Sequence, residues 1–556
     1  MYNHMTSNIG TNSGPVKIFF PSQISNMTLP YLTDDCIYSI LQYLQNDHST
    51  LFKCLLVNRF WCRSTIPLLY ANPFAAITKK NYSITLTLIF CFDKAEILQL
   101  KKQLGLRQIN GINFYKKHNP LFEYPKYLEN YNSNIINSVI YGWFAKYCSK
   151  NLLNNQKIYN DIIPIFHQSI LRQSRNIKQL DIWLNLFYGE SFKNFNVQNF
   201  TSNLTKLNSL SLNCYLRDSV YKEIEQEFLK NIANNCTNFR KLIIKFPRTK
   251  NSPFQNRYIY CDYLTTITFT LKICTIIQVQ NNLKMFKLDG NCSLLVDNIL
   301  LSLEFQKHSL VHVEFIDTDF SNVNLKRLNN LYNLEYLKFM TCEGILLNQC
   351  EGLNFSSFKL KELSFIHNYW DVNVMPLMIK YLGASLQRLF VENPTISLIE
   401  NISMYCPNLI FLKISIHSHI DLSVIQLFKN LRTRILSIII SKNIDKFFIN
   451  LANSIPINIR EISICSHHTD KFKEFLENCH NSFEMINLNQ IIKLKLLKNV
   501  LNYIEKSNNS LKVLGMKLDK ELNDEELKLL NRIKAKGVEI VEFIKVFHCK
   551  SSTDDK

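Results

Sequence analysis

The sequence feature that most limits the fold of this chain is a short apolar kernel, repeated along much of its 556 residues. Each kernel has apolar residues at positions 1, 4 and 6, with variable residues between them. Kernels begin at Ile177, Leu207, Phe239, Leu264, Leu283, Leu310, Leu334, Leu360, Leu386, Leu409, Ile435, Ile459, Phe483 and Leu511. Successive kernels lie about 26 residues apart on average, and fourteen of them at such regular spacing indicate a repeat array.

A period of roughly 20 to 29 residues with this kernel is typical of the leucine-rich repeat. Each repeat supplies a short strand, a turn and usually a helix, and repeats stack because none can bury its apolar face alone. The run Cys406-Pro407-Asn408-Leu409 resembles the start of the cysteine-containing subclass of these repeats. We therefore expect an α/β chain, with a solenoid and C-terminal cap over residues 171–545, parallel strands on its concave face and helices on its convex face.

Residues 29–72 carry a different pattern, one of short helices. Ile37, Ile40, Leu41 and Leu44 form one stripe of an amphipathic helix, with Thr33 as its expected N-cap. Ser49 or Thr50 is expected to cap a second helix, and a third apolar patch follows Asn58. Three short helices cannot hide this much apolar surface, so we expect a docking face for a partner.

The same segment resembles an F-box. The resemblance covers about 40 residues and rests on Leu29-Pro30, the apolar stripe, and the run Leu55-Leu56-Val57-Asn58-Arg59 followed by Trp61. It departs from many F-boxes at Leu32, where an acidic residue is common. The resemblance implies a three-helix domain that binds the Skp-type adaptor of a cullin-based ubiquitin ligase. Under it, the adaptor-binding residues are Leu29, Pro30, Leu32, Ile37, Ile40, Leu41, Leu44, Leu55, Val57, Asn58 and Trp61.

The remaining segments complete the predicted domain organisation. Residues 1–28 and 546–556 are expected to be tails. Residues 73–170 are interpreted as a helical linker, an N-terminal cap or degenerate repeats. Near the C-terminus, residues 522–536 have a helical pattern, and residues 538–543 are expected to form a final strand. An F-box followed by leucine-rich repeats is a known family architecture, and the Asn-, Ile- and Lys-rich style resembles expanded F-box families of certain soil fungi.

Composition narrows the class of protein further. The chain carries 64 Lys and Arg against 45 Asp and Glu, a net charge of +19, but these charges are scattered. We find no Walker-type loop, dinucleotide fingerprint, signal peptide or apolar run long enough to span a membrane. The 16 cysteines show no CxxC pairing, so reduced thiols and a cytoplasmic or nuclear location are expected.

Positions 3 and 5 of each kernel are expected to line the concave face. Five bases and four acids fall there, so the basic excess of the chain does not gather on this face, and a protein partner is favoured over nucleic acid. Aromatic residues mixed with Arg and Lys are typical of interface hot spots. The candidate substrate-binding residues are Met285, Tyr336, Lys338, Arg388, Phe390, Phe411 and Lys413.

Metal and catalytic sites are not indicated by the sequence. His417-x-His419 and Cys465-x-His467-His468 contain zinc-ligand residue types but lack the paired spacing of a structural site, so no metal or cofactor is expected. Cys54, Cys214 and Cys342 are interpreted as small buried residues rather than nucleophiles. The favoured function is a non-catalytic adaptor that delivers a protein substrate for ubiquitination and proteasomal degradation. A binding scaffold outside any ligase and a basic nucleic-acid or membrane-surface binder remain the alternatives.

Overall fold

The computed structural model describes residues 32–74, 83–104, 108–109, 112–113, 120–147, 158–214, 222–246, 263–290, 293–356, 359–417, 420–441, 446–466, 471–517 and 521–543. The chain divides into two compact units, Met1–Leu69 and Tyr70–Lys556, which we call unit 1 and unit 2. No helix within the described ranges is long and apolar enough to cross a bilayer.

Unit 1 is built from helices α1 (Asp34–Tyr43) and α2 (His48–Cys54) and most of α3 (Arg59–Ala71). Thr33 caps α1 as predicted, since its hydroxyl accepts from Cys36 N at 3.4 Å. The cap of α2 is Asp47, whose Oδ1 accepts from Thr50 N at 3.0 Å, so the prediction of Ser49 or Thr50 is wrong. A carboxylate there also matches the positive end of the helix dipole.

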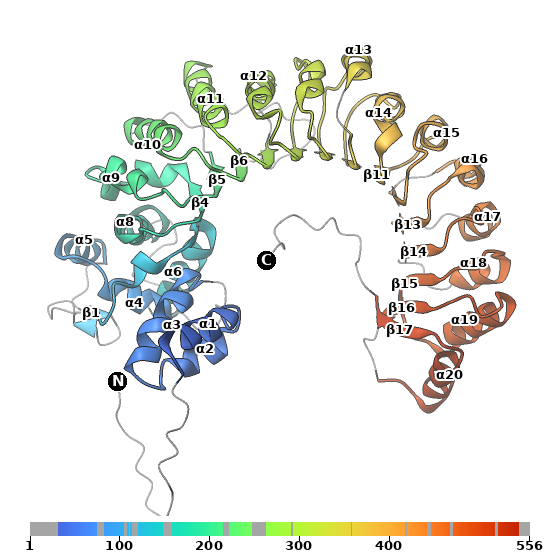
Figure 1. Ribbon diagram of the computed structural model, residues 1–556, viewed down its shortest axis with the longest axis horizontal. Coiled ribbons are helices and arrows are strands. Elements are labelled where there is room, and N and C mark those ends of the chain that lie inside the picture. The colour runs from blue at the N-terminus through green and yellow to red at the C-terminus, as the bar shows by residue number, and fades with distance from the viewer. Residues whose placement is uncertain are drawn as a thin grey trace, which may run out of the picture. The chain divides into compact units, whose positions relative to one another are not determined.

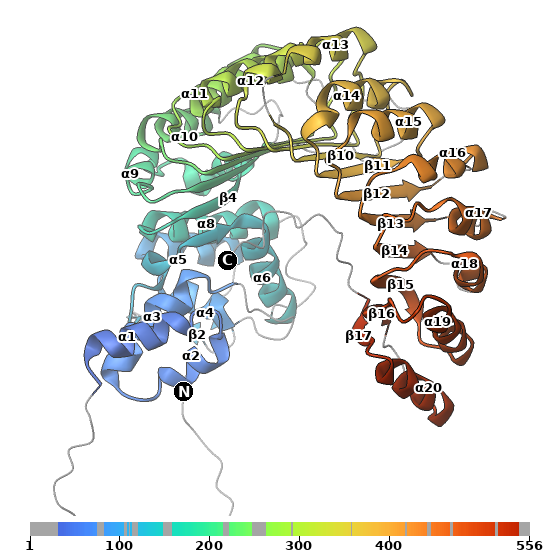
Figure 2. The same ribbon diagram turned by 45° about the vertical axis from the view of Figure 1, so that its right-hand side comes forward.

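The described residues of unit 2 include one sheet of fifteen parallel strands that follow each other in chain order. Figures 1 and 2 show these strands along the inner side of the curved repeat array and the helices along its outer side. This is the α/β solenoid expected from the kernels. The strands are β3 (Asn130–Asn132), β4 (Gln179–Trp183), β5 (Ser209–Asn213), β6 (Lys241–Lys245), β7 (Met285–Asp289), β8 (His312–Ile316), β9 (Tyr336–Met340), β10 (Glu362–Ile366), β11 (Arg388–Glu392), β12 (Phe411–Ile416), β13 (Ile435–Ile440), β14 (Glu461–Ser466), β15 (Met485–Ile491), β16 (Val513–Lys517) and β17 (Glu539–Glu542).

Thirteen of the fourteen kernels coincide with the strands from β4 to β16. The kernel predicted at Leu264 is wrong, because that residue lies in helix α11 (Tyr263–Gln278). Apolar residues at positions 1, 4 and 6 of a strand kernel also fit part of a helical stripe. The stripe continues through the buried Phe269, Ile273 and Ile277, whose spacing of four residues is helical.

The helices of the repeats cover the outer side of the sheet (Figure 1). They are mixed in length, and several repeats add a 3₁₀ turn to the α-helix. Between β8 and β9 the described residues form the 3₁₀ turn η6 in place of an α-helix. The α-helices are α9 (Val197–Ser202), α10 (Lys222–Asn235), α11, α12 (Ser293–Leu303), α13 (Leu347–Glu351), α14 (Val374–Leu382), α15 (Ile396–Tyr405), α16 (Leu422–Gln426), α17 (Phe447–Ser454), α18 (Phe472–Asn478), α19 (Leu494–Lys506) and α20 (Asp524–Ala535). The 3₁₀ turns are η3 (Leu184–Tyr188), η4 (Glu190–Phe192), η5 (Glu304–Gln306), η6 (Leu325–Asn330), η7 (Gly352–Phe355), η8 (Gly383–Ser385) and η9 (Leu427–Asn430).

The N-terminal part of unit 2 already belongs to the solenoid. β3 pairs in parallel with β4, so the expected boundary at residue 171 falls inside the sheet. A small antiparallel pair, β1 with β2, precedes it. The elements of this part are α4 (Ser83–Phe90), α5 (Lys94–Leu104), β1 (Gln108–Ile109), β2 (Ile112–Asn113), η1 (Tyr124–Tyr127), α6 (Ser133–Tyr147), the π-helical turn η2 (Ile158–Ile162) and α8 (Ile163–Gln173).

The core of unit 2 is one continuous apolar cluster between the sheet and the helices. At kernel position 6, Phe315, Phe339 and Phe365 of three neighbouring strands stack with ring centroids 5.8 and 6.0 Å apart. Trp370 meets Phe339 edge-on at 5.7 Å. This column shows how stacked repeats bury side chains that one repeat alone would expose.

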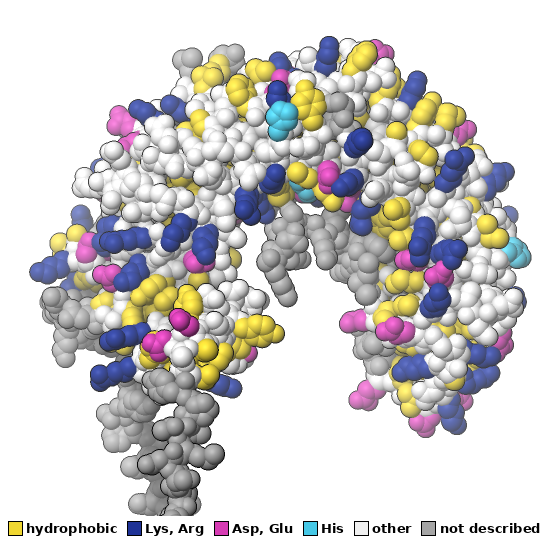
Figure 3. All heavy atoms as spheres, viewed as in Figure 1, with side chains coloured by type: hydrophobic (Ala, Val, Ile, Leu, Met, Phe, Trp, Pro, Cys, Tyr) yellow, Lys and Arg dark blue, Asp and Glu magenta, His cyan; other side chains and the backbone are white. Residues whose placement is uncertain are grey.

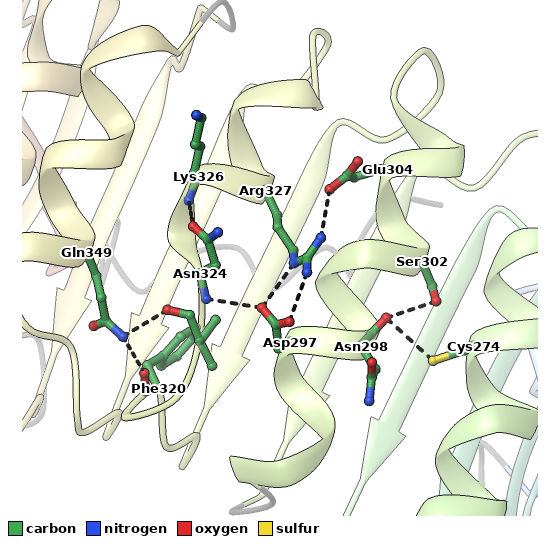
Figure 4. Close-up of polar contacts among 11 residues, drawn as sticks. Cys274, Asp297, Asn298, Ser302, Glu304, Phe320, Asn324, Lys326, Arg327 and Gln349 are labelled. Carbon is green, nitrogen blue, oxygen red and sulfur yellow. Dashed lines mark hydrogen bonds and ion pairs between the residues drawn. The ribbon is translucent and has the colours of Figure 1, made fainter.

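Polar side chains also join successive repeats. Asn333 Nδ2 donates to His308 O at 2.6 Å, and Asn408 Nδ2 donates to Ala384 O at 2.8 Å, one repeat earlier in each case. On the helical side, Figure 4 shows Asp297 of α12 accepting two hydrogen bonds from Arg327 of η6, each at 3.0 Å. These contacts fix the spacing of the repeats where apolar packing alone is less directional.

Candidate protein-binding surfaces

The described part of unit 1 exposes more large apolar side chains than it buries. Its buried cluster consists of Ile37, Leu41, Leu51 and Cys54. Tyr43 is 90% exposed and Leu56 is 80% exposed. The full exposed set within the described part of unit 1 is Leu32, Tyr38, Ile40, Tyr43, Phe52, Leu56 and Val57. An apolar excess of this kind in a small helical unit is typical of a docking surface, which makes this face a candidate.

The predicted adaptor-binding residues divide between this surface and the core beneath it. Leu29 and Pro30 lie outside the described residues. The exposed members are Leu32, Ile40, Val57 and Asn58, the half-buried members are Leu44, Leu55 and Trp61, and the buried members are Ile37 and Leu41. The buried residues therefore hold the helices together, and the exposed ones are free to contact a partner.

Asn58 has a structural role in addition to its exposure. Its Oδ1 accepts from Trp61 N at 2.9 Å at the start of α3. An Asn in this place satisfies a backbone N–H that the helix cannot pair internally. Sequence reasoning left Tyr38, Tyr43, Phe52 and Leu56 out of the binding set. Tyr38, Tyr43 and Phe52 could have been found as apolar residues that lie off the buried stripe of their helix, whereas Leu56 lies in the turn after α2.

On the concave face of unit 2, the strand register brings most of the predicted substrate-binding residues together. Arg388 lies opposite Phe411, and Phe390 lies opposite Lys413, on the neighbouring strands β11 and β12. Tyr336 and Lys338 lie on β9, separated from β11 by β10 alone. Met285, on β7, lies two strands further from this group. Six of the seven predicted residues thus belong to one patch.

Within this patch the cations cover the aromatic rings. The guanidinium carbon of Arg388 lies 4.9 Å from the ring centroid of Phe411 and 5.8 Å from that of Phe390. Lys413 Nζ lies 5.8 Å from the Phe390 centroid. Phe390 is only 3% exposed and Phe411 only 2% exposed. The accessible part of this patch is therefore its charged groups, supported by nearly buried rings beneath them.

Ion pairs balance the charges of the concave face. Arg388 Nε lies 3.0 Å from Glu362 Oε2, and Lys287 Nζ lies 3.6 Å from Glu314 Oε2. Burial favours a raised pKa for both carboxyl groups. For Glu362 burial prevails despite Arg388, and its pKa is raised. For Glu314, the hydrogen bond from His312 and the charges of Lys338 and Lys287 outweigh burial and lower its pKa to about 2.

This pairing leaves a mosaic of charge rather than a basic stripe. Figure 3 views the repeat array along the edge of the sheet, and in this view Asp and Glu side chains lie among the Lys and Arg side chains. His312 stacks on Tyr336, with ring centroids 5.5 Å apart. It adds an ionisable group to this face that is left out when histidines are counted as neutral. A mosaic of paired charges suits a protein surface better than a phosphate backbone.

The other sequence candidates occupy less distinctive positions. Cys54, Cys214 and Cys342 are buried, and burial raises the pKa of the Cys342 thiol to about 12, which keeps it protonated. Cys465 accepts a hydrogen bond from Asn489 Nδ2 at 3.2 Å. His419, His467 and His468 lie outside the described residues.

The chain matches no protein-family model and no curated protein. Similar solved structures include a chain of the Rad7 and Elc1 complex from yeast, at 15% identity and a TM-score of 0.32, over 62% of this chain and 77% of that one. A protein from Bacteroides fragilis is similar at 16% identity and a TM-score of 0.25, over 47% and 66% of the two chains. The plant peptide hormone receptor RGFR1, in complex with RGF2, is similar at 12% identity and a TM-score of 0.24, over 62% and 63%. Likenesses at this level carry no conclusion about what the chain binds.

Proposed function

We propose that this chain is a substrate-recognition adaptor of a cullin-based ubiquitin ligase. In this proposal, unit 1 docks on a Skp-type adaptor and the concave face of unit 2 holds the protein to be ubiquitinated. The chain itself performs no chemistry. It raises the effective concentration of a substrate lysine near the ubiquitin-charged enzyme, which is sufficient to direct the modification.

The observation that carries the proposal is the exposed apolar surface of unit 1. It coincides with the segment whose sequence resembles an F-box, including Val57 of the Val-Asn-Arg-x-Trp run and Leu56 just before it, both exposed. Burying a Leu or Val side chain at an interface contributes about 1.5–3 kcal/mol. A handful of such contacts is enough for stable association with another protein.

The concave face supports the second half of the proposal. Its Arg388-centred patch combines a cation, an ion pair with Glu362 and two supporting rings. Arginine and aromatic residues in such clusters dominate many protein interfaces. The balance of charge on the same face favours a protein ligand over nucleic acid.

Co-purification of the full chain with a Skp-type adaptor tests the proposal. A Leu56→Asp/Val57→Asp variant places two charges on the exposed surface and should lower adaptor recovery by about tenfold or more. The matched control is Ile457→Asp, a similarly exposed apolar residue of unit 2, which should bind like the parent. Circular dichroism of all three chains establishes that each is folded.

The outcomes separate the proposal from its alternatives. Failure of a well-folded parent chain to retain the adaptor would contradict it and leave a free-standing binding scaffold. Retention of nucleic acid that falls steeply with salt would instead support the basic-binder alternative.

A further inference from the structure

Three residues of ligand type meet at the carboxyl ends of neighbouring strands in unit 2. His367 follows β10, Glu392 is the last residue of β11, and His417 follows β12. Each is separated from the next by 25 residues, close to the repeat period. Since the ends of parallel strands meet at one edge of a sheet, the repeat itself brings these side chains together.

The side chains face one another closely. One donor atom from each of the three residues lies within 4.8 Å of the other two. His367 Nδ1 is 3.0 Å from Glu392 Oε2, and His417 Nε2 is 3.4 Å from Glu392 Oε1. The two imidazole rings are 5.1 Å apart between centroids. His367 Nδ1 and His417 Nε2 each face an oxygen of the Glu392 carboxylate. If neither nitrogen carried a proton, its lone pair would repel the oxygen, so a proton or a metal ion must lie between each nitrogen and the carboxylate.

The surrounding structure holds these groups in place. The second ring nitrogen of His417, Nδ1, is 2.9 Å from Ser441 Oγ, which directs Nε2 toward Glu392. His417 N donates to Asn393 Oδ1 at 2.9 Å. His367 has a left-handed backbone, with φ of +51°, a conformation that a non-glycine residue rarely adopts without support. Metal-binding histidines are commonly oriented by such a hydrogen bond at the other ring nitrogen.

A cavity of about 300 Å³ lies beside the three residues, and all of them line it. Its wall also includes Tyr369 and Trp370, so it has an apolar as well as a polar side. Glu392 is only 14% exposed in its side chain, whereas His367 and His417 are more accessible. The cluster is therefore reachable from solvent, and the cavity leaves room for water or an incoming ligand atom.

We propose that His367, Glu392 and His417 bind a divalent transition-metal ion of the zinc class. Two imidazoles and one carboxylate form a ligand set that zinc uses when a fourth position stays open. Imidazole favours such ions over magnesium and calcium, which prefer oxygen ligands. The ion would join three successive repeats beside the concave face and keep one coordination position toward the cavity. This inference does not depend on the proposed ligase role.

Titration of the full chain with Co²⁺ tests the site. Co²⁺ reports its ligands through visible absorption, and thiolate ligands would add an intense charge-transfer band. We expect one equivalent of Co²⁺ bound without that band and displaced by Zn²⁺. The variants His367→Ala and His417→Ala should each weaken binding by about a hundredfold or more, because they remove ligands, and Ser441→Ala by about ten- to a hundredfold, because it removes only the orienting bond.

The matched control is His480→Ala, an exposed histidine outside the cluster, which should bind Co²⁺ like the parent. Circular dichroism shows whether each variant is folded. Stoichiometric binding that survives in a folded His367→Ala/His417→Ala double variant would overturn the proposal. Absence of equimolar binding by the parent, or a spectrum dominated by thiolate charge transfer, would overturn it as well.

Discussion

At the residue scale, His167 in helix α8 illustrates how burial sets the charge of a side chain. It is fully buried, with Nδ1 2.6 Å from the Tyr131 hydroxyl and Nε2 2.6 Å from Asn137 Oδ1. An amide oxygen only accepts, so Nε2 carries the proton and Tyr131 donates to Nδ1. Burial lowers the pKa of His167 to about 3. The ring is therefore neutral in the folded chain.

This pKa predicts acid sensitivity that begins near neutral pH. Between the ordinary value of 6.5 and about 3, the unfolded chain binds a proton at His167 that the folded chain does not. Its contribution to stability is complete above pH 6.5 and declines as the pH falls, by up to about 1.4 kcal/mol per pH unit. Denaturant unfolding at several pH values measures this slope.

The variant His167→Gln separates this effect from other titrating groups. It should be less stable than the parent at pH 7, because it loses the fitted hydrogen bonds, but its stability should depend less on pH between 6.5 and 5. The exposed His308→Ala variant should keep the parent slope. An unchanged slope in the Gln variant would contradict the assignment.

The concave patch gives a second prediction at this scale. Arg388→Ala removes the partner of the largely buried Glu362 and the cover of Phe390 and Phe411, so it should cost about 1–3 kcal/mol. Arg434→Ala is the matched control, since its pair with Glu461 is longer, at 3.7 Å, and more exposed, and should cost less than about 1 kcal/mol. Equal losses of unfolding free energy in the two variants would show that Arg388 stabilises the fold no more than an exposed ion pair does.

At the scale of elements, the strands were predictable because each kernel repeats the same apolar spacing at positions 1, 4 and 6. Thirteen kernels became strands, whereas the pattern at Leu264 continues as a helix in α11. Strand β3 escaped prediction because it has three residues and lacks a full kernel. The cluster of His367, Glu392 and His417 was not predicted, because these residues end or follow strands. The kernel pattern does not indicate which side chains meet at those positions.

Contacts between elements carry a third prediction. Asp297 of α12 accepts from Arg327 and from Asn324 N, and these bonds lower its pKa against the opposing effect of burial (Figure 4). A double-mutant cycle with Asp297→Asn and Arg327→Met should give a coupling energy of about 0.5–3 kcal/mol. The exposed pair Glu190–Lys193 should couple by no more than about 0.5 kcal/mol. A coupling no larger than that of the control would contradict the role of the pair in joining repeats.

The carboxyl group of Asp297 also determines how the stability of the fold depends on pH. The folded pKa of Asp297 lies below its ordinary value of 3.8, so its contribution is present above that value and is lost as the pH falls through the folded pKa. Asp297→Asn should therefore flatten the stability profile of the chain only below about pH 3.8, at the acid end of the range in which His167 acts.

At the scale of the whole molecule, the chain consists of two compact units with different surfaces. The solenoid was predictable because each repeat interacts mainly with its neighbours, so a local rule builds the entire array. Which unit 1 residues are buried and which are exposed was less predictable, because one apolar stripe supplies both core residues and exposed residues. Ile37 and Ile40 belong to that stripe, yet only Ile37 is buried.

Hydrogen–deuterium exchange of the full chain, with and without a Skp-type adaptor, tests the central claim most directly. Binding through unit 1 should slow exchange in peptides from residues 32–69 and leave the amides of β10 to β12 unchanged. The Leu56→Asp/Val57→Asp variant should show no such protection. Protection confined to the concave strands, or no protection by an adaptor in excess, would contradict the account.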